Sequence, residues 1–228
     1  MKYIPSIAFE EMSGSAKGVT AAKVRSRKYI RNKGTGGSVR TSYQSSVKSI
    51  FKQFSQSWKS LTNAQILAWN ALALSQAGKR ILGTSAKLTG SNLYMRLNYW
   101  IVYCGGTAVA NPPTLEGVEA PADATLTLSA SAMTLQLASI PASVANIKLI
   151  IQASVPQSNG VTRAYSKAAS FADPYTPVAT AIDIKAAYDA KNGAPTAAAP
   201  KVFFKWFYVN TVTGEKSGEM MGYAKLAE

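Results

Sequence analysis

The sequence predicts an α+β protein with three parts: an extended basic N-terminal arm, a small helical hairpin or bundle, and a C-terminal β-sandwich. Three observations predict it. Positive charge is concentrated in the first half, apolar residues recur every three or four positions between residues 45 and 106, and they alternate beyond residue 122. We place the arm at residues 1–44, the helical part at 45–106, a proline-rich linker at 107–121 and the sandwich at 122–228.

Charge separates the two halves of the chain. Its 228 residues include 25 Lys and Arg against 11 Asp and Glu, giving a formal net charge of +14. Residues 1–110 hold 16 of the cations and two acids, Glu10 and Glu11, whereas residues 111–228 hold nine of each sign. The whole excess therefore lies in the first half, which predicts a polyanionic or acidic partner for that half.

The arm is rich in Gly, Ser, Thr, Lys and Arg, and no helical or strand period persists in it beyond a turn. We expect it to order on contact with a partner. The cations expected to make that contact are Lys23, Arg25, Arg27, Lys28, Arg31, Lys33 and Arg40. A protein surface is favoured over nucleic acid, because only Tyr29 and Tyr43 lie near the charge as residues that could stack on bases.

The helical part begins with an amphipathic helix that we expect to start near Ser45. Lys48, Lys52 and Lys59 lie off its apolar stripe and make its outer side basic. Short connections to two further helices favour a hairpin or bundle. The expected core residues are Phe51, Phe54, Trp58, Leu61, Trp69, Leu93, Leu97 and Trp100.

Capping signals bound the second and third helices. Thr62 with Gln65 forms a capping box at the start of the second, and Gly78 is its expected end. Ser91 is the expected cap of the third helix, which would end at Gly105–Gly106.

The C-terminal part has seven segments with the alternation of β-strands, separated by turn residues. They are residues 124–131, 132–139, 146–155, 161–170 (the weakest), 178–184, 201–211 and 218–226. Seven strands in about 108 residues are typical of an immunoglobulin or fibronectin-III type sandwich. Residues 185–193 are expected to form a helical turn that ends at Gly193.

The segment 201–209 carries aromatic residues on both of its faces. Phe203 and Phe207 lie opposite the side that holds Phe204, Trp206 and Tyr208. Something must therefore cover the second face. We consider a subunit interface through Phe203 and Phe207, and packing within the chain against the helical part or a loop is the alternative.

Composition excludes several kinds of chemistry. The chain has no histidine and one cysteine, Cys104, so it cannot form an internal disulfide, a Cys/His zinc site or a histidine-dependent triad. Cys104 ends an apolar run and is expected to be a buried structural thiol. Acidic residues are scattered singly and form no calcium-loop motif. We therefore expect no catalytic residues, no metal and no cofactor.

The chain shows neither a signal peptide at its start nor an apolar run of the ~20 residues that a membrane span needs. We therefore expect folding in a cytoplasm and no membrane contact.

Two motifs of the helical part carry a family resemblance. Residues 58–70 have the pattern W-x-x-L-T-x-x-Q-x-x-A-W-N, and residues 90–98 have G-x-N-L-Y-x-x-L-N. With the preceding K-V-R-S-R-K-Y-I-R and the following sandwich, this order resembles small structural proteins of tailed phages and prophages of Bacteroidota, the crAss-like phages among them. Tyr94 stands where that pattern more often has Phe.

The resemblance implies a non-enzymatic virion component, most specifically a head-fibre or capsid-decorating subunit that is assembled in the host cytoplasm and anchored by its basic arm. A neck or tail protein of the same particle is the alternative position. The expected partners are other virion proteins, with homo-oligomers also expected. From its charge alone, a DNA-associated basic protein is the alternative class, with nucleic acid as the second choice of partner.

Overall fold

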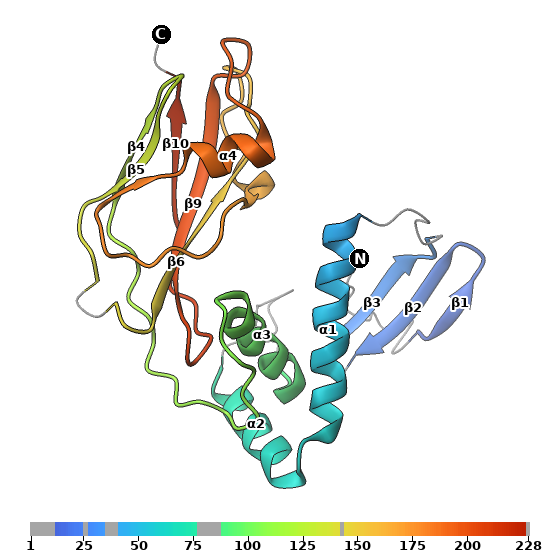
Figure 1. The fold of residues 1–228 in the computed structure, drawn as a ribbon. Helices are drawn as coiled ribbons and strands as arrows, with labels where there is room; N and C mark the ends of the chain where they lie inside the picture. The colour runs from blue at the N-terminus through green and yellow to red at the C-terminus, as the bar shows by residue number, and fades with distance from the viewer. Residues whose placement is uncertain (1–11, 25–26, 35–40, 77–87, 142–143, 227–228) are drawn as a thin grey trace.

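The structure is a computed structural model, and it describes residues 12–24, 27–34, 41–76, 88–141 and 144–226. Figure 1 shows its three parts: a small N-terminal sheet beside α1, three helices, and a C-terminal unit of two sheets. Helix α3 lies next to the end of the C-terminal unit that contains β6 and β9. The chain is thus α+β.

The N-terminal part differs from the extended arm that we expected. Strands β1 (Gly14–Ala16), β2 (Val19–Val24) and β3 (Arg27–Asn32) form an antiparallel sheet in the order β1-β2-β3. A two-residue turn joins β1 to β2, with Lys17 at a positive φ of 46°. The sequences of β2 (VTAAKV) and β3 (RKYIRN) do not alternate apolar with polar residues, so the period-2 pattern of a half-buried strand is missing from them. Within the described residues, no side chain of this sheet is buried.

Capping fixes the helix starts. Helix α1 (Ser42–Ser60) begins before Ser45, because Thr41 and Gln44 form a capping box that we did not anticipate. Helix α2 (Asn63–Ser75) has the expected capping box of Thr62 and Gln65, while the expected stop at Gly78 lies outside the described residues. Helix α3 (Gly90–Tyr103) is capped by Thr89, not by Ser91, since the Thr89 hydroxyl accepts a hydrogen bond from the N–H of Asn92.

The helical core contains Phe54, Trp69, Leu93 and Leu97, with Trp58 and Leu61 partly buried beside it. Tyr94, which we did not predict, lies at its centre, and its ring centroid is 5.3 Å from that of Trp69 and 5.4 Å from that of Trp58. Two expected core residues lie elsewhere. Phe51 is 43% exposed and stacks on Tyr99, and Trp100 packs against the C-terminal unit.

The C-terminal unit has two antiparallel sheets, in the orders β4-β5-β8 and β10-β9-β6-β7. Its elements are β4 (Ala124–Leu128), β5 (Met133–Leu137), β6 (Ile147–Ala153), β7 (Ala169–Ser170), β8 (Ala181–Asp183), α4 (Lys185–Asn192), β9 (Lys201–Asn210) and β10 (Met220–Lys225). Each of the seven predicted segments contains one strand. The fourth retains only two strand residues, because Tyr165–Lys167 form a 3-10 turn.

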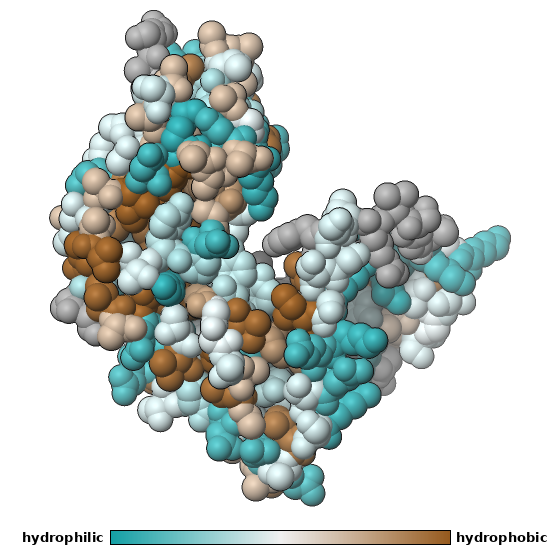
Figure 2. All heavy atoms as spheres, viewed as in Figure 1, coloured by the Kyte–Doolittle hydropathy of each residue, from teal (hydrophilic) through white to brown (hydrophobic). Residues whose placement is uncertain are grey.

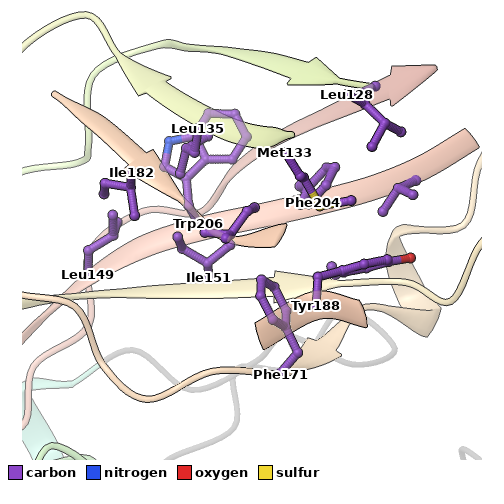
Figure 3. Close-up of a cluster of buried hydrophobic side chains, with 14 of the residues drawn as sticks. Leu128, Met133, Leu135, Leu149, Ile151, Phe171, Ile182, Tyr188, Phe204 and Trp206 are labelled. Carbon is purple, nitrogen blue, oxygen red and sulfur yellow. The ribbon is translucent and has the colours of Figure 1, made fainter. Parts of the chain in front are cut away.

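The core of this unit lies between the two sheets. Figure 3 shows Leu135 and Ile182 of one sheet opposite Ile151 and Trp206 of the other. All four are buried, and Tyr188 of α4 is buried against one side of the same cluster. The indole N–H of Trp206 also donates to the carbonyl of Ala122 at 3.4 Å, which connects the segment before β4 to β9.

Candidate functional site

Positive charge dominates the N-terminal half of the molecule. Between residues 12 and 115 the sequence has no Asp or Glu. It has the following cations: Lys17, Lys23, Arg25, Arg27, Lys28, Arg31, Lys33, Arg40, Lys48, Lys52, Lys59, Lys79, Arg80, Lys87 and Arg96. Ion pairs between described residues all lie in the C-terminal unit, between Lys185 and Asp189 and between Glu219 and two lysines.

Helix α1 aligns three of these cations. Lys48, Lys52 and Lys59 are exposed, and their spacing of four and seven residues places them within about 40° of helix rotation. The opposite side of α1 buries Phe54 in the helical core. In Figure 2, hydrophilic side chains cover the lower half of the region that Figure 1 assigns to α1. We call these three residues the α1 lysine row.

The N-terminal sheet distributes its cations over both faces. Lys23 and Lys28 are cross-strand partners on one face, whereas Arg31 pairs with Thr20 on the other. Lys33 follows β3 and is exposed.

For three of the seven expected contact residues the structure does not describe the side chain. Arg25 and Arg40 lie outside the described residues, and the side chain of Arg27 lies outside the described part. The basic surface therefore consists of the N-terminal sheet, with cations on both faces, and the α1 lysine row. The sequence indicates that the outer side of α1 is basic, but our expected contact residues all lie in the arm.

The first family-like motif holds a later segment of the chain in place. Trp69 donates its indole N–H to the carbonyl of Ala110 at 2.8 Å. Gln65, besides capping α2, donates from its amide to the Oδ1 of Asn111 at 3.0 Å. Both side chains thus fasten the start of the linker to α2.

The second motif does the same from α3. Asn98 is fully buried, and its Oδ1 accepts a hydrogen bond from the N–H of Val109 at 2.6 Å. Its Nδ2 donates to the carbonyls of Val109 and Tyr94 at 3.3 and 3.1 Å. The long-range partner of Asn98 is thus the segment after α3.

The two motifs also contact each other directly. The N–H of Gly90 donates to the Oδ1 of Asn70 at 3.2 Å. A Cβ at residue 90 would lie 2.5 Å from that oxygen and 2.9 Å from the main-chain N of Asn70, so this position needs glycine. We call Gln65, Trp69, Asn70, Gly90 and Asn98 the linker clamp. Their side chains and main-chain groups make hydrogen bonds that hold segments of the chain together.

The candidate subunit interface at Phe203 and Phe207 is buried within the chain. Phe207 packs edge-on against Trp100 of α3, with ring centroids 5.4 Å apart, and the Nζ of Lys216 lies 3.8 Å from its ring centre. Phe203 is covered by Tyr165, 5.2 Å away. The intrachain alternative accounts for both residues, because the helical part and a loop cover this face.

The junction between the helical part and the C-terminal unit is closely packed. Gly214 has a positive φ of 71°, and a Cβ there would overlap the carbonyl of Leu97. Cys104 contacts the cluster of Ile150, Phe207 and Val209. Burial raises the pKa of the Cys104 thiol to about 11, although the nearby Lys148 acts in the opposite direction. The thiol is half-buried.

The described residues contain no group of three or more potential metal ligands among His, Cys, Asp and Glu. None of their helices is both long and apolar enough to cross a bilayer.

Comparisons of this chain with family models, with curated proteins and with solved structures found no match.

Proposed function

We propose that this chain is a non-enzymatic structural subunit of a tailed phage particle, most specifically a head-fibre or capsid-decorating protein. In this proposal the N-terminal sheet and the α1 lysine row bind an acidic surface formed by neighbouring virion proteins, and the C-terminal unit projects from it. The observation that carries the proposal is the run of residues 12–115, which holds cations and no acids while the remainder of the chain is nearly balanced.

Physical considerations favour a broad contact over one strong site. Exposed charges are screened beyond about 8 Å at physiological ionic strength, and each exposed ion pair contributes about 0–1 kcal/mol. Several pairs must therefore form together. The α1 lysine row can form several ion pairs at once. Its three residues lie on one helix that is packed against α3 through the buried Phe54, so binding costs little backbone conformational entropy.

The clamp and the junction support a structural role. Linker-clamp residues fix the segment 109–111 on the helices, and Trp100 and Gly214 pack the helices against the C-terminal unit. Such a connection transmits the orientation of the anchored part to the projecting part. A decorating subunit that projects from a surface requires such a connection.

We further infer that the C-terminal unit is of the immunoglobulin or fibronectin-III type. The inference is supported by the strand order. β4, β5 and β8 occupy the places of strands A, B and E, and β6, β9 and β10 occupy those of C, F and G, with β7 beside C. Strands that alternate between sheets in this way form the Greek-key connections of that class.

The proposal is tested by deleting residues 1–40 in the phage that encodes the chain and quantifying the protein in purified particles. We expect the truncated chain to be lost from particles while it remains folded by circular dichroism. Retention at normal copy number would contradict the proposal. Binding of the full chain to duplex DNA with a steep salt dependence, and no binding to particles lacking it, would favour the DNA-associated alternative.

A further inference from the structure

A small cavity lies in the C-terminal unit, where the linker enters β4 and the chain leaves β5. Its volume is about 280 Å³, and it is lined by Glu119, Ala120 and Ala122 before β4, residues 139–141 after β5, and Tyr208 of β9. The cavity opens to solvent at Glu119 and Ser139, which are exposed, while Tyr208 is only 2% exposed. It is separate from the basic N-terminal surface and from the linker clamp.

One buried polar group of this cavity has no hydrogen-bond partner in the part of the chain that the structure describes. The hydroxyl of Tyr208 is buried and has no hydrogen-bond partner among the described residues. In the same part of the chain, Glu119 belongs to none of the ion pairs, which involve Asp189 and Glu219 only. A buried hydroxyl without a partner is unfavourable, so native structures normally supply one from water or a ligand.

The negative charge of the Glu119 carboxylate acts on that hydroxyl. Burial is the main cause of the raised pKa of Tyr208, and the negative charge of Glu119 raises it further. The lining of the cavity therefore includes a tyrosine with an unpartnered hydroxyl, a glutamate and a serine.

The chemistry of these groups selects a class of ligand. A carboxylate only accepts hydrogen bonds, and hydroxyl oxygens can also accept them, so the complementary group is a donor with positive charge. The remaining walls are apolar, formed by Ala120, Ala122, Ile140 and Pro141, and suit a short methylene chain. We propose that this cavity binds the end of a primary alkylammonium group, with Glu119 and Tyr208 as the acceptors of its hydrogen bonds.

Binding of an alkylammonium group in this cavity does not depend on the proposed virion function, because the cavity lies apart from the basic N-terminal surface. The test uses the full chain labelled with ¹⁵N and n-butylammonium as the probe, followed by NMR. We expect saturable shifts confined to residues 119–122, 139–141 and those next to Tyr208, with a Kd in the millimolar range for so small a ligand.

Neutral n-butanol is the matched probe, because it has the same chain length and no charge. It should produce much smaller shifts. In the protein, Glu119→Gln should weaken butylammonium binding about tenfold and Tyr208→Phe several-fold. Glu116→Gln and Tyr175→Phe are matched control variants outside the cavity, and both should bind as the unaltered chain does.

A second probe, N-acetyl-lysine methylamide, distinguishes two sources of the ammonium group. If it binds like butylammonium, the source is a lysine side chain of another protein. If butylammonium alone binds, the source is a free amine, and in both cases the site is supported. Absence of saturable shifts from either probe at about 0.1 M, or equal shifts from n-butanol, would overturn the proposal and leave a water-filled cavity.

Discussion

The side chain of Asn98 binds both main-chain groups of Val109, accepting from its N–H at 2.6 Å and donating to its carbonyl at 3.3 Å. A buried amide side chain thereby replaces the secondary-structure partners that this segment lacks. Together with the bond from Trp69 to Ala110, it fixes the start of the linker on two helices. The direction in which the C-terminal unit leaves the helical part depends on these bonds.

Replacing Asn98 by Ala should destabilise the protein by about 2–4 kcal/mol, because it removes a fully buried side chain and leaves two partly buried main-chain groups of Val109 without partners. Urea unfolding of the full chain measures this change. Asn92→Ala is the matched control, since Asn92 lies on the same helix with its side chain exposed, and it should change stability by less than about 0.5 kcal/mol. Equal effects of the two substitutions would contradict the clamp.

Gly90→Ala should lower the free energy of unfolding by about 1–3 kcal/mol, because its Cβ would overlap atoms of Asn70. Gly160→Ala serves as control. It has open space at the Cβ position and should be neutral or slightly stabilising. Adding Asn70→Ala to Gly90→Ala should recover only part of the loss, since the main-chain N of residue 70 remains 2.9 Å from the new Cβ. Thermal unfolding of the three variants should therefore rank Gly160→Ala as the most stable, the double variant next and Gly90→Ala as the least stable.

The junction between the helices and the C-terminal unit should show energetic coupling. Trp100 and Phe207 form an edge-to-face pair at 5.4 Å and 81°, so a double-mutant cycle to Ala should give a coupling of about 0.5–1.5 kcal/mol. Denaturant unfolding monitored by circular dichroism provides the four free energies. If the two single substitutions change the free energy of unfolding additively, the helical part and the C-terminal unit do not stabilise each other through this pair. That result would contradict our description of the junction.

Cys104 should react slowly with thiol reagents at pH 8. A pKa of about 11 leaves roughly 0.1% of the thiol ionised at that pH, against about 10% for a thiol at the ordinary value of 9.0. Ser166→Cys, in an exposed position, gives the reference rate in a Cys104→Ala background. Comparable labelling rates for the two thiols would show that Cys104 is not shielded.

The same shift has a consequence for stability. The folded state holds the Cys104 proton more strongly than the unfolded state, so this contribution is complete below about pH 9 and is lost as the pH rises toward 11. Cys104→Ala should therefore flatten the decline of stability over this pH range. Equal declines with and without the thiol would contradict the raised pKa.

Much of the fold was predictable from the sequence, because its signals are local. Alternation located all seven strands of the C-terminal unit, and the capping box of Thr62 and Gln65 located α2. The start of a helix was harder to predict where two neighbouring residues could both act as its N-cap. Thr89 and Ser91 are both good caps, and only the geometry of the turn selects Thr89.

The remaining features depend on contacts between distant segments, which a single sequence does not encode in its spacing. Phe51 and Trp100 share the apolar stripes of their helices, yet one stacks at the surface on Tyr99 and the other packs against β9. The partner of Asn98 is eleven residues away along the chain and that of Trp69 forty-one. Only the fold brings these groups together.

The central claim, that the basic N-terminal surface anchors the chain to a virion, is tested most directly by reversing the charge of the α1 lysine row. Copy number per particle is measured for Lys48→Glu, Lys52→Glu and Lys59→Glu combined. The matched control combines Arg163→Glu, Lys167→Glu and Lys225→Glu, three exposed cations of the C-terminal unit. We predict that the first variant folds and is lost from particles while the control is retained. Equal retention of both would contradict the account.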